Sequence, residues 1–167
     1  IPSGTMSHHK EELVIKPADM LELIPMIAKL RTDEVARPAV YPSDNIGYFG
    51  RYEKDLRDRG AKINFWIGCR AGLQVIGIES DGGIKGCLSL PSNMHGHDIF
   101  LEGNLREKSM REIWQDKDGF AYNRKFSEEQ LEGFCARCRY RDICRGGCAW
   151  TAYSHTRKRF DNPYCFY

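Results

Sequence analysis

The chain has 167 residues, of which 41% are hydrophobic and 29% charged, and its formal net charge is +2. This length and balance are typical of one globular domain, or of a small domain with part of another, and they disfavour a disordered segment. No apolar run reaches the ~18 residues of a membrane span and no secretory signal is visible, so we expect a cytoplasmic protein without a membrane partner. Residues 1–15 are interpreted as a tag or frayed terminus.

Residues 16–62 contain few apolar residues for their length. A helical pattern opens at Pro17, which suits the first helical position, and apolar residues then recur on one face. Pro25 falls inside this pattern, so the helix is expected to be kinked or to start later. An extended run, a loop and a polar helix are predicted next, over residues 39–41, 44–50 and 51–59. This section is interpreted as the tail of a larger structure.

Short strands and short helices are predicted for the middle of the chain. Strands are expected over residues 63–67, 73–79, 84–88 and 99–101, with the turn Ser80-Asp81-Gly82-Gly83 joining the second to the third. Capping boxes at Ser109 and Ser127 predict two short helices. The sequence beyond them is rich in loops until residues 149–155. These patterns predict an α+β fold with a small β-hairpin, short helices and cysteine-rich loops that bind metal.

The cysteines form an unusual array. Cys69 and Cys87 come first, with Gly82 five positions before Cys87, and Cys135-x2-Cys138-x5-Cys144-x3-Cys148 and Cys165 follow. Gathered thiolates select soft metals and iron–sulfur clusters. Inert core thiols are disfavoured because these cysteines lie in loops rich in Arg and Gly. Disulfides are disfavoured by the odd count and the missing secretory signal.

Positive charge is concentrated where the cysteines are densest. Residues 135–167 carry seven Lys and Arg against two Asp, whereas residues 1–134 have a formal charge of −3. Arginines near thiolate ligands would offset the negative charge of an iron–sulfur cluster. A nucleic-acid-binding patch is the alternative, but no stacking platform or recognised motif accompanies the charge. We therefore expect no nucleic-acid partner.

The cysteine spacing, with Gly82 and the Gly146-Gly147 pair, resembles the SPASM domain over residues 69–167. This family is the auxiliary iron–sulfur domain of radical S-adenosylmethionine (SAM) enzymes that modify ribosomally made peptides and proteins. The resemblance implies two auxiliary [4Fe–4S] clusters that relay electrons or engage substrate. It assigns the thiols by position, with Cys69, Cys87 and Cys148 in the first cluster and Cys135, Cys138, Cys144 and Cys165 in the second.

The resemblance also implies a domain organisation. Residues 63–167 would be the auxiliary-cluster domain, and residues 16–62 the C-terminal end of a partial TIM barrel with its bridge. The implied partners are the remaining radical SAM barrel of the parent enzyme and a precursor peptide or protein substrate.

Two departures from the family pattern matter. Some members have a further cysteine ligand six positions before Cys69, where this chain has Ile63. The first cluster would then have an open iron or take a ligand from water, substrate or a nearby side chain, for which the candidates are Glu79, Asp81, His95, His97 and Asp98. The chain also lacks the C-x3-C-x2-C motif of the catalytic cluster. We therefore expect no catalytic residue here and S-adenosylmethionine only in the intact parent enzyme.

A zinc-stabilised structural or binding module without a redox role is the alternative function. Two tetrahedral sites would use the same thiols, one with four thiolates and one with three plus His or water. Zinc knuckles usually come as two C-x2-C steps, and this chain has one, which favours iron–sulfur. The substrate stays open, because core packing explains the aromatic candidates for a groove as well as substrate binding does. These candidates are Trp114, Tyr140, Trp150 and Tyr153.

Overall fold

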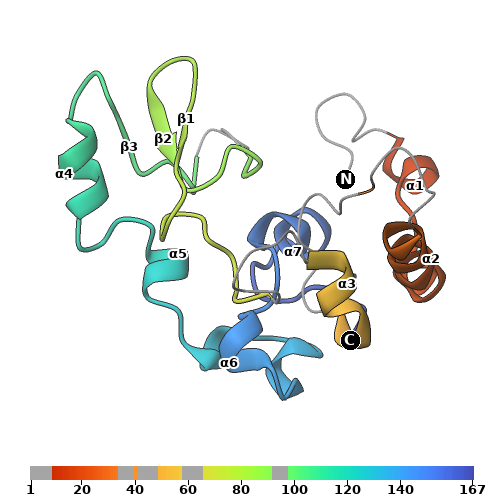
Figure 1. Cartoon of the computed structure of the whole chain (residues 1–167). Helices are drawn as coiled ribbons and strands as arrows, with labels where there is room; N and C mark the ends of the chain where they lie inside the picture. The colour runs from red at the N-terminus through yellow and green to blue at the C-terminus, as the bar shows by residue number, and fades with distance from the viewer. Residues whose placement is uncertain (1–8, 34–39, 41–48, 58–65, 92–97) are drawn as a thin grey trace. The chain divides into compact units, whose positions relative to one another are not determined.

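The computed structural model describes residues 9–33, 40, 49–57, 66–91 and 98–167 (Figure 1). The chain divides into two compact units. Unit 1 combines Ile1–Gly68 with Leu131–Tyr167, and unit 2 is Cys69–Gln130. The N-terminal section and the cysteine-dense C-terminal section therefore belong to the same unit.

Unit 1 is helical in the part that the structure describes. Its helices are α1 (Lys10–Leu13), α2 (Met20–Thr32), α3 (Glu53–Arg57), α6 (Arg141–Cys144) and α7 (Ala149–Thr156). Single 3-10 turns precede α2, α3 and α6, at Pro17–Asp19, Gly50–Tyr52 and Cys135–Arg137. The part of the chain assigned to a tag or frayed terminus thus contains a short helix, α1.

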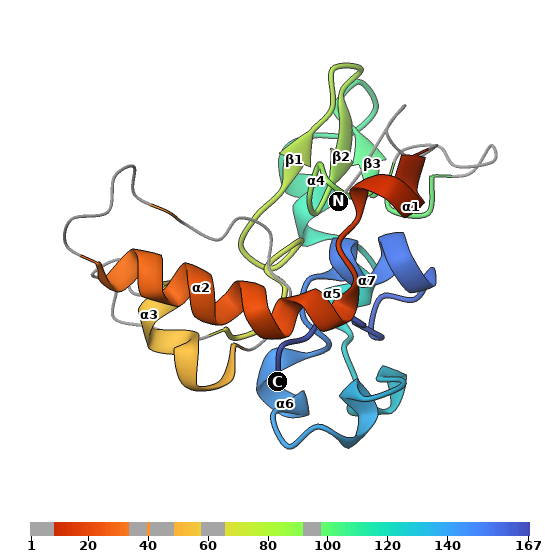
Figure 2. The same cartoon turned by 90° about the vertical axis from the view of Figure 1, so that its right-hand side faces the viewer.

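The predicted first helix starts later than its pattern, at Met20, because Pro17 opens a 3-10 turn instead. Pro25 lies inside α2, and Figure 2 shows the helix running on through it as one coil. A proline removes the hydrogen bond to the carbonyl four residues earlier. Here that carbonyl belongs to Leu21, whose side chain is exposed, so water can replace the missing donor.

The core of unit 1 joins its two ends. Met20, Ile24 and Ala28 are spaced by four residues and form the buried face of α2. They pack with three further buried residues, which are Phe49, Leu56 of α3 and Tyr164 near the C-terminus. Five partly buried residues pack against this cluster: Val14, Leu23, Ile27, Tyr52 and Phe166. The section that reads as apolar-poor in sequence therefore builds its core together with the last residues of the chain.

Unit 2 contains a three-stranded antiparallel sheet in the order β1-β2-β3. The strands are β1 (Gly77–Ile78), β2 (Gly83–Lys85) and β3 (Gly103–Asn104), followed by α4 (Met110–Gln115), α5 (Ala121–Arg124) and a 3-10 turn at Glu128–Gln130. Ile84 of the central strand packs with Ile113 and Phe120 in the core of the unit. The predicted hairpin is confirmed, and Gly82 occupies its turn with φ of 92°, a conformation that favours glycine.

Several predicted elements differ from the structure. The predicted strand at 99–101 is wrong: Phe100 is buried in a turn and the third strand forms at Gly103–Asn104. Both hairpin strands are shorter than predicted, so Cys87 follows the end of β2 rather than lying on it. The predicted strand at 63–67 is not seen at Trp66 and Ile67, and its first three residues lie outside the described ranges.

Local helix signals agree better with the structure. Ser109 and Glu112 make both hydrogen bonds of the predicted capping box at the start of α4. Ser127 precedes only a single 3-10 turn. The polar helix expected over 51–59 is described from Gly50 to Arg57, and most of the extended run and loop between 39 and 50 lies outside the described residues. In the described ranges, no helix has the length and apolarity needed to cross a membrane.

Candidate metal centre

The four thiols predicted to hold the second cluster lie in unit 1, and their charges affect the ionisation of Cys144. The pKa of Cys144 is raised to about 12, mainly by burial, with a contribution from negative charge on Cys165, Cys135 or Cys138. Burial also raises the pKa of Cys135, and Cys138 adds to that shift. Charges act on each other in this way only at short range. The thiols that the family resemblance groups with Cys144 therefore lie within electrostatic range of it.

The four thiols are not arranged as the ligands of one metal ion. Among the residues that the structure describes, no three His, Cys, Asp or Glu side chains stand in an arrangement that holds a metal ion. None of the seven cysteines, all of which lie in the described ranges, forms a disulfide. Metal binding would require the thiols to lose their protons and the sulfur atoms to turn inward, so the affinity would depend on pH.

Backbone amides support three of the four thiols. The Tyr140 amide donates a hydrogen bond to the Cys138 Sγ over 3.4 Å. Amide hydrogen bonds from Gly147 and Asn162 lower the pKa of Cys144 and Cys135, respectively, against the larger effect of burial. Such donors stabilise thiolates, and in metal sites they orient the ligands and tune the potential. This donor set fits a soft metal or an iron–sulfur cluster.

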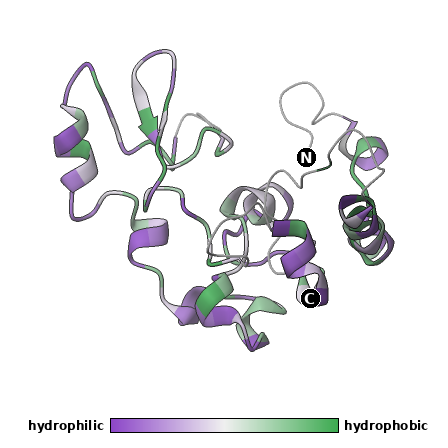
Figure 3. Cartoon of the chain, in the orientation of Figure 1, coloured by the Kyte–Doolittle hydropathy of each residue, from purple (hydrophilic) through white to green (hydrophobic). Residues whose placement is uncertain are grey.

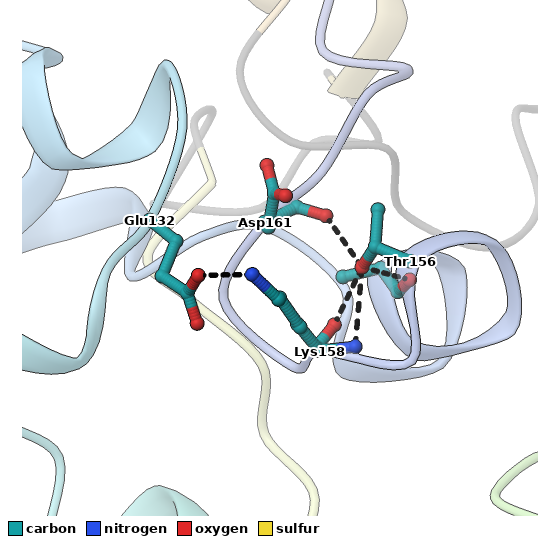
Figure 4. A network of polar contacts seen from close by, with 5 residues as sticks. Glu132, Thr156, Lys158 and Asp161 are labelled. Atoms are coloured by element: carbon teal, nitrogen blue, oxygen red, sulfur yellow. Dashed lines mark hydrogen bonds and ion pairs between the residues drawn. The ribbon is translucent and has the colours of Figure 1, made fainter.

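Cys135 is positioned by polar contacts that fasten the start of the cysteine segment to the chain after α7. Glu132 forms an ion pair with Lys158 (Figure 4). The Glu132 amide also donates a hydrogen bond to the Phe160 carbonyl over 3.2 Å. The Thr156 hydroxyl donates to the carbonyls of Lys158 and Asp161 at 3.1 and 3.2 Å. Residues far apart in sequence are thereby held together beside the thiols.

Cys165 is positioned by the two aromatic residues beside it. Tyr164 is buried in the core of unit 1, and its hydroxyl donates to the Ile15 carbonyl over 2.9 Å. Phe166 makes an edge-to-face contact with Tyr52, with ring centroids 5.6 Å apart. The N-terminal helical section therefore anchors the last of the four thiols.

Cys144 ends α6, and its carbonyl accepts a hydrogen bond from the Trp66 indole over 3.2 Å. The buried carboxylate of Glu53 accepts a short hydrogen bond from the backbone amide of Trp66. The same carboxylate accepts a hydrogen bond from the Phe49 amide at 2.8 Å and forms an ion pair with Arg57. Glu53 was not anticipated from the sequence, because nothing distinguishes it from the other charged residues of a polar helix.

Cys69 and Cys87, predicted for the first cluster, lie in unit 2 on chain segments that pack tightly together. A Cβ atom at Gly86 would lie only 2.8 Å from the Gly72 nitrogen. The side-chain amide of Asn123 stabilises the segment that contains Cys69. It donates hydrogen bonds to the carbonyls of Ala71 at 2.7 Å and Cys69 at 3.4 Å. Cys148, the third thiol predicted for this cluster, belongs to unit 1, where it precedes α7.

Candidate fourth ligands near Cys87 already have other contacts. Lys85 is completely buried, and its Nζ lies 3.2 Å from Glu79 and 2.7 Å from Asp98. Asp81 accepts a hydrogen bond from the Gly83 amide at 3.0 Å. His95 and His97 lie outside the described residues. The role of Lys85 was not predictable from the sequence, since a lysine in a short strand is ordinarily exposed.

The aromatic residues considered for a groove lie in different places. Trp114 packs against the core of unit 2, beside the ring of Phe120. Tyr140 makes an edge-to-face contact with Tyr167 in unit 1. Trp150 and Tyr153 are half-buried residues of α7. No groove shared by all four follows from these contacts.

Comparison with known proteins finds a family that part of the chain resembles. Residues 69–139 match the model of the SPASM family, an iron–sulfur cluster-binding domain. This segment is similar to that family over somewhat less than half of the chain. The match begins at Cys69 and includes Cys87, Cys135 and Cys138, so it covers both the hairpin and the C-x2-C step.

Curated relatives agree with this assignment. The AdoMet-dependent heme synthase of Methanosarcina barkeri is 35% identical over 102 residues, which are 60% of this chain and 26% of that protein. The mycofactocin maturase MftC of Mycolicibacterium smegmatis is 38% identical over 81 residues, 48% of this chain and 19% of that protein. The chain thus spans about a quarter or less of the length of these relatives.

The solved structure of native anSMEcpe with bound AdoMet has a similar fold. Its TM-score is 0.50 at 16% identity, over 99% of this chain and 41% of that chain. The likeness in fold includes the N-terminal helical section as well as residues 69–139, because nearly the whole chain is aligned.

Proposed function

We propose that this chain is the auxiliary-cluster part of a radical SAM enzyme and that it binds two [4Fe–4S] clusters. The observation that carries the proposal is the thiol set of unit 1, in which three thiols receive amide hydrogen bonds and the charges of the other three contribute to the raised pKa of Cys144. The SPASM match gives the same chemistry for the domain. Seven thiols would need a reducing compartment, so we place the protein in the cytoplasm.

In this proposal Cys135, Cys138, Cys144 and Cys165 hold one cluster, and Cys69, Cys87 and Cys148 hold the other. When bound, such clusters accept and release single electrons, and a three-thiolate site leaves one iron available to an outside ligand. The chain's own residues orient the sulfurs: Tyr164 and Phe166 fix the C-terminal thiol through the core, and Trp66 fixes the end of α6.

We further propose that residues 16–62 are the end of a partial TIM barrel and that the parent enzyme acts on a peptide or protein. The similarity of nearly the whole chain to anSMEcpe supports the first part. The name of the relative MftC, a maturase, supports the second. The relative named a heme synthase makes a tetrapyrrole the competing substrate. Because this chain lacks C-x3-C-x2-C, it should not cleave S-adenosylmethionine by itself.

Anaerobic reconstitution with iron and sulfide tests the proposal on the full chain. We expect a brown protein with about eight iron and eight sulfide per chain, and an electron paramagnetic resonance signal after reduction. A colourless chain that keeps only zinc after the same treatment would favour the zinc module instead.

Serine substitutions test the assignment of thiols to the two clusters. Cys144→Ser should remove about four iron per chain and leave the other cluster, and Cys69→Ser should do the reverse. The two variants serve as controls for each other, because each keeps six cysteines. If both remove all the iron or neither removes any, the division into four and three thiols is wrong.

A further inference from the structure

Two oppositely charged residues are buried in α3, a helix that is otherwise polar. Figure 3 shows α3 as hydrophilic over most of its length, in agreement with its sequence Glu-Lys-Asp-Leu-Arg. The Glu53 side chain is nevertheless only 7% exposed, and that of Arg57 only 15%. Burying an ion pair costs hydration free energy, and a surface helix does not require it. The position of this pair in unit 1 therefore needs a further explanation.

The Glu53 carboxylate joins Arg57 to the segment that leads to Cys69. One carboxylate oxygen accepts hydrogen bonds from the Arg57 side chain and from the Trp66 amide, and the other accepts one from the Phe49 amide at 2.8 Å. The Arg57 guanidinium carbon lies 4.3 Å from the ring centroid of Phe49 and 5.3 Å from that of Trp66. The guanidinium is thus held in one place by a carboxylate and two aromatic rings.

Trp66 connects this arrangement to one of the four thiol residues. Its indole N–H donates to the Cys144 carbonyl over 3.2 Å. Two residues later, a Cβ atom at Gly68 would lie 3.2 Å from the Arg145 side chain and 3.4 Å from the Ile143 carbonyl. Residues 66–68 therefore pack closely along the end of α6, against Cys144 and both of its neighbours in the chain.

The charge of Arg57 also acts at this cysteine. Burial lowers the pKa of Arg57, whereas negative charge on Glu53 and on Cys144 raises it. Charges act on each other in this way only at short range. The contacts through Trp66 and the electrostatics thus involve the same cysteine, Cys144.

We propose that Arg57 is a positioning residue of the four-thiol site and raises the reduction potential there, while Glu53 opposes its charge. The inference rests on the proposed iron–sulfur function. One-electron reduction adds one negative charge at the four thiols, and no bond or proton changes place. A fixed cation nearby therefore favours the reduction, and a fixed carboxylate nearby disfavours it.

A purely structural ion pair is the alternative, and two substitutions of opposite charge distinguish it. Arg57→Gln removes a positive charge and Glu53→Gln removes a negative charge, yet both break the same ion pair. If the pair only maintained the fold, both variants would shift the potential in the same direction or not at all. If charge acts on the site, the two shifts have opposite signs.

Redox titration of the cluster-loaded full chain with dithionite, followed by electron paramagnetic resonance, measures these shifts. Cys69→Ser identifies the signal of the four-thiol cluster, because it should remove the other cluster. At a fixed applied potential, Arg57→Gln should lower the ratio of reduced to oxidised cluster at least about tenfold, which corresponds to about 59 mV for one electron. Glu53→Gln should raise the same ratio at least about threefold.

Two further variants serve as controls. Arg57→Lys keeps the charge and should leave the ratio within about threefold of the natural chain. Arg51→Gln removes an exposed arginine that lies 4.8 Å from the Tyr52 ring centroid, and it should change the ratio by less than about twofold, because water screens exposed charges.

Three results would overturn the inference: shifts of Arg57→Gln and Glu53→Gln in the same direction, no shift in either, or loss of the four-thiol cluster from a variant that still folds. Urea titration establishes whether each variant folds. If Arg57→Gln does not fold, the rise expected for Glu53→Gln decides the outcome by itself. A natural chain that assembles no cluster would contradict the proposed function, so the two failures are distinguishable.

Discussion

Lys85 offers the sharpest test of how unit 2 is stabilised. Its side chain is completely buried in the central strand, with its Nζ 3.2 Å from Glu79 and 2.7 Å from Asp98. At an effective dielectric constant of about 20, contacts at these distances correspond to gross attractions of about 5 and 6 kcal/mol. Much of this offsets the loss of hydration of the ammonium group, so the net contribution of the network is smaller.

Replacing Lys85 by methionine keeps the length of the side chain and removes its charge. Glu79 and Asp98 are then left near each other, only 22% and 12% exposed, without the cation between them. Removing one partner from a buried ion pair typically costs about 3–5 kcal/mol, which would raise the opening equilibrium of the hairpin by about 10²–10⁴-fold.

Native-state hydrogen exchange of the hairpin amides measures this change directly. The Glu79 amide bonds to the Gly83 carbonyl and the Glu102 amide bonds to the Ile84 carbonyl, each at 2.8 Å, so both report opening of the sheet. Lys117→Met, at an exposed lysine, is the control and should leave their exchange unchanged.

The double variant Lys85→Met/Asp98→Asn separates charge from packing. If the pair is coupled, the second substitution should cost at least about 1 kcal/mol less in the Lys85→Met background than in the natural chain. A loss below about 1 kcal/mol for Lys85→Met, or additive losses in the double variant, would refute the argument that these charges stabilise the hairpin.

Three further changes have clear expected outcomes. Ser109→Ala removes the cap of α4 and should lower the free energy of unfolding of unit 2 by about 1 kcal/mol in urea titrations. Gly72→Ala should cost at least about 2 kcal/mol more than Gly50→Ala in the same assay: both have positive φ, but only at Gly72 would the new methyl lie within 2.4 Å of a side chain. In the metal-free chain at pH 8, Cys144 should react with a thiol reagent at least about 10²-fold more slowly than Cys138, because burial raises its pKa to about 12, and its rate should rise about tenfold per pH unit; equal rates, read by mass spectrometry, would contradict the burial.

Signals confined to neighbouring residues were the most predictable from sequence. The capping box at Ser109 needs only residues three positions apart, and the hairpin needs only its turn and flanking strands. The third strand was misplaced because apolar residues at 99–101 suggested a strand, whereas sheet pairing selected Gly103 and Asn104. Strand pairing depends on partners distant in sequence, which local apolarity does not specify.

The thiols were predictable from sequence, whereas the contacts that position them were not. The resemblance to the SPASM family grouped Cys135, Cys138, Cys144 and Cys165, whereas the cysteine spacing by itself indicated only a soft-metal or iron–sulfur site. The hydrogen bond from Tyr164 to the Ile15 carbonyl joins residues 149 positions apart, and no local pattern encodes it. The helices α5 and α6 were not predicted from the sequence. Phe120 before α5 and Arg145 after α6 have positive φ, a conformation that a local sequence pattern predicts at glycine rather than at these residues.

The way unit 1 holds its thiols suggests that scaffold and ligands can be separated by mutation. Cys165 is positioned by hydrophobic packing, Cys135 by polar contacts around Thr156, and Cys144 by a hydrogen bond from Trp66. None of these contacts uses a sulfur atom, so they can gather the thiols before metal arrives. Substitution of one of these cysteines should therefore abolish metal binding by the four thiols of unit 1 and largely preserve the core of that unit. Tyr164→Ala should weaken both metal binding and the core, because it opens a cavity where the C-terminus meets α2.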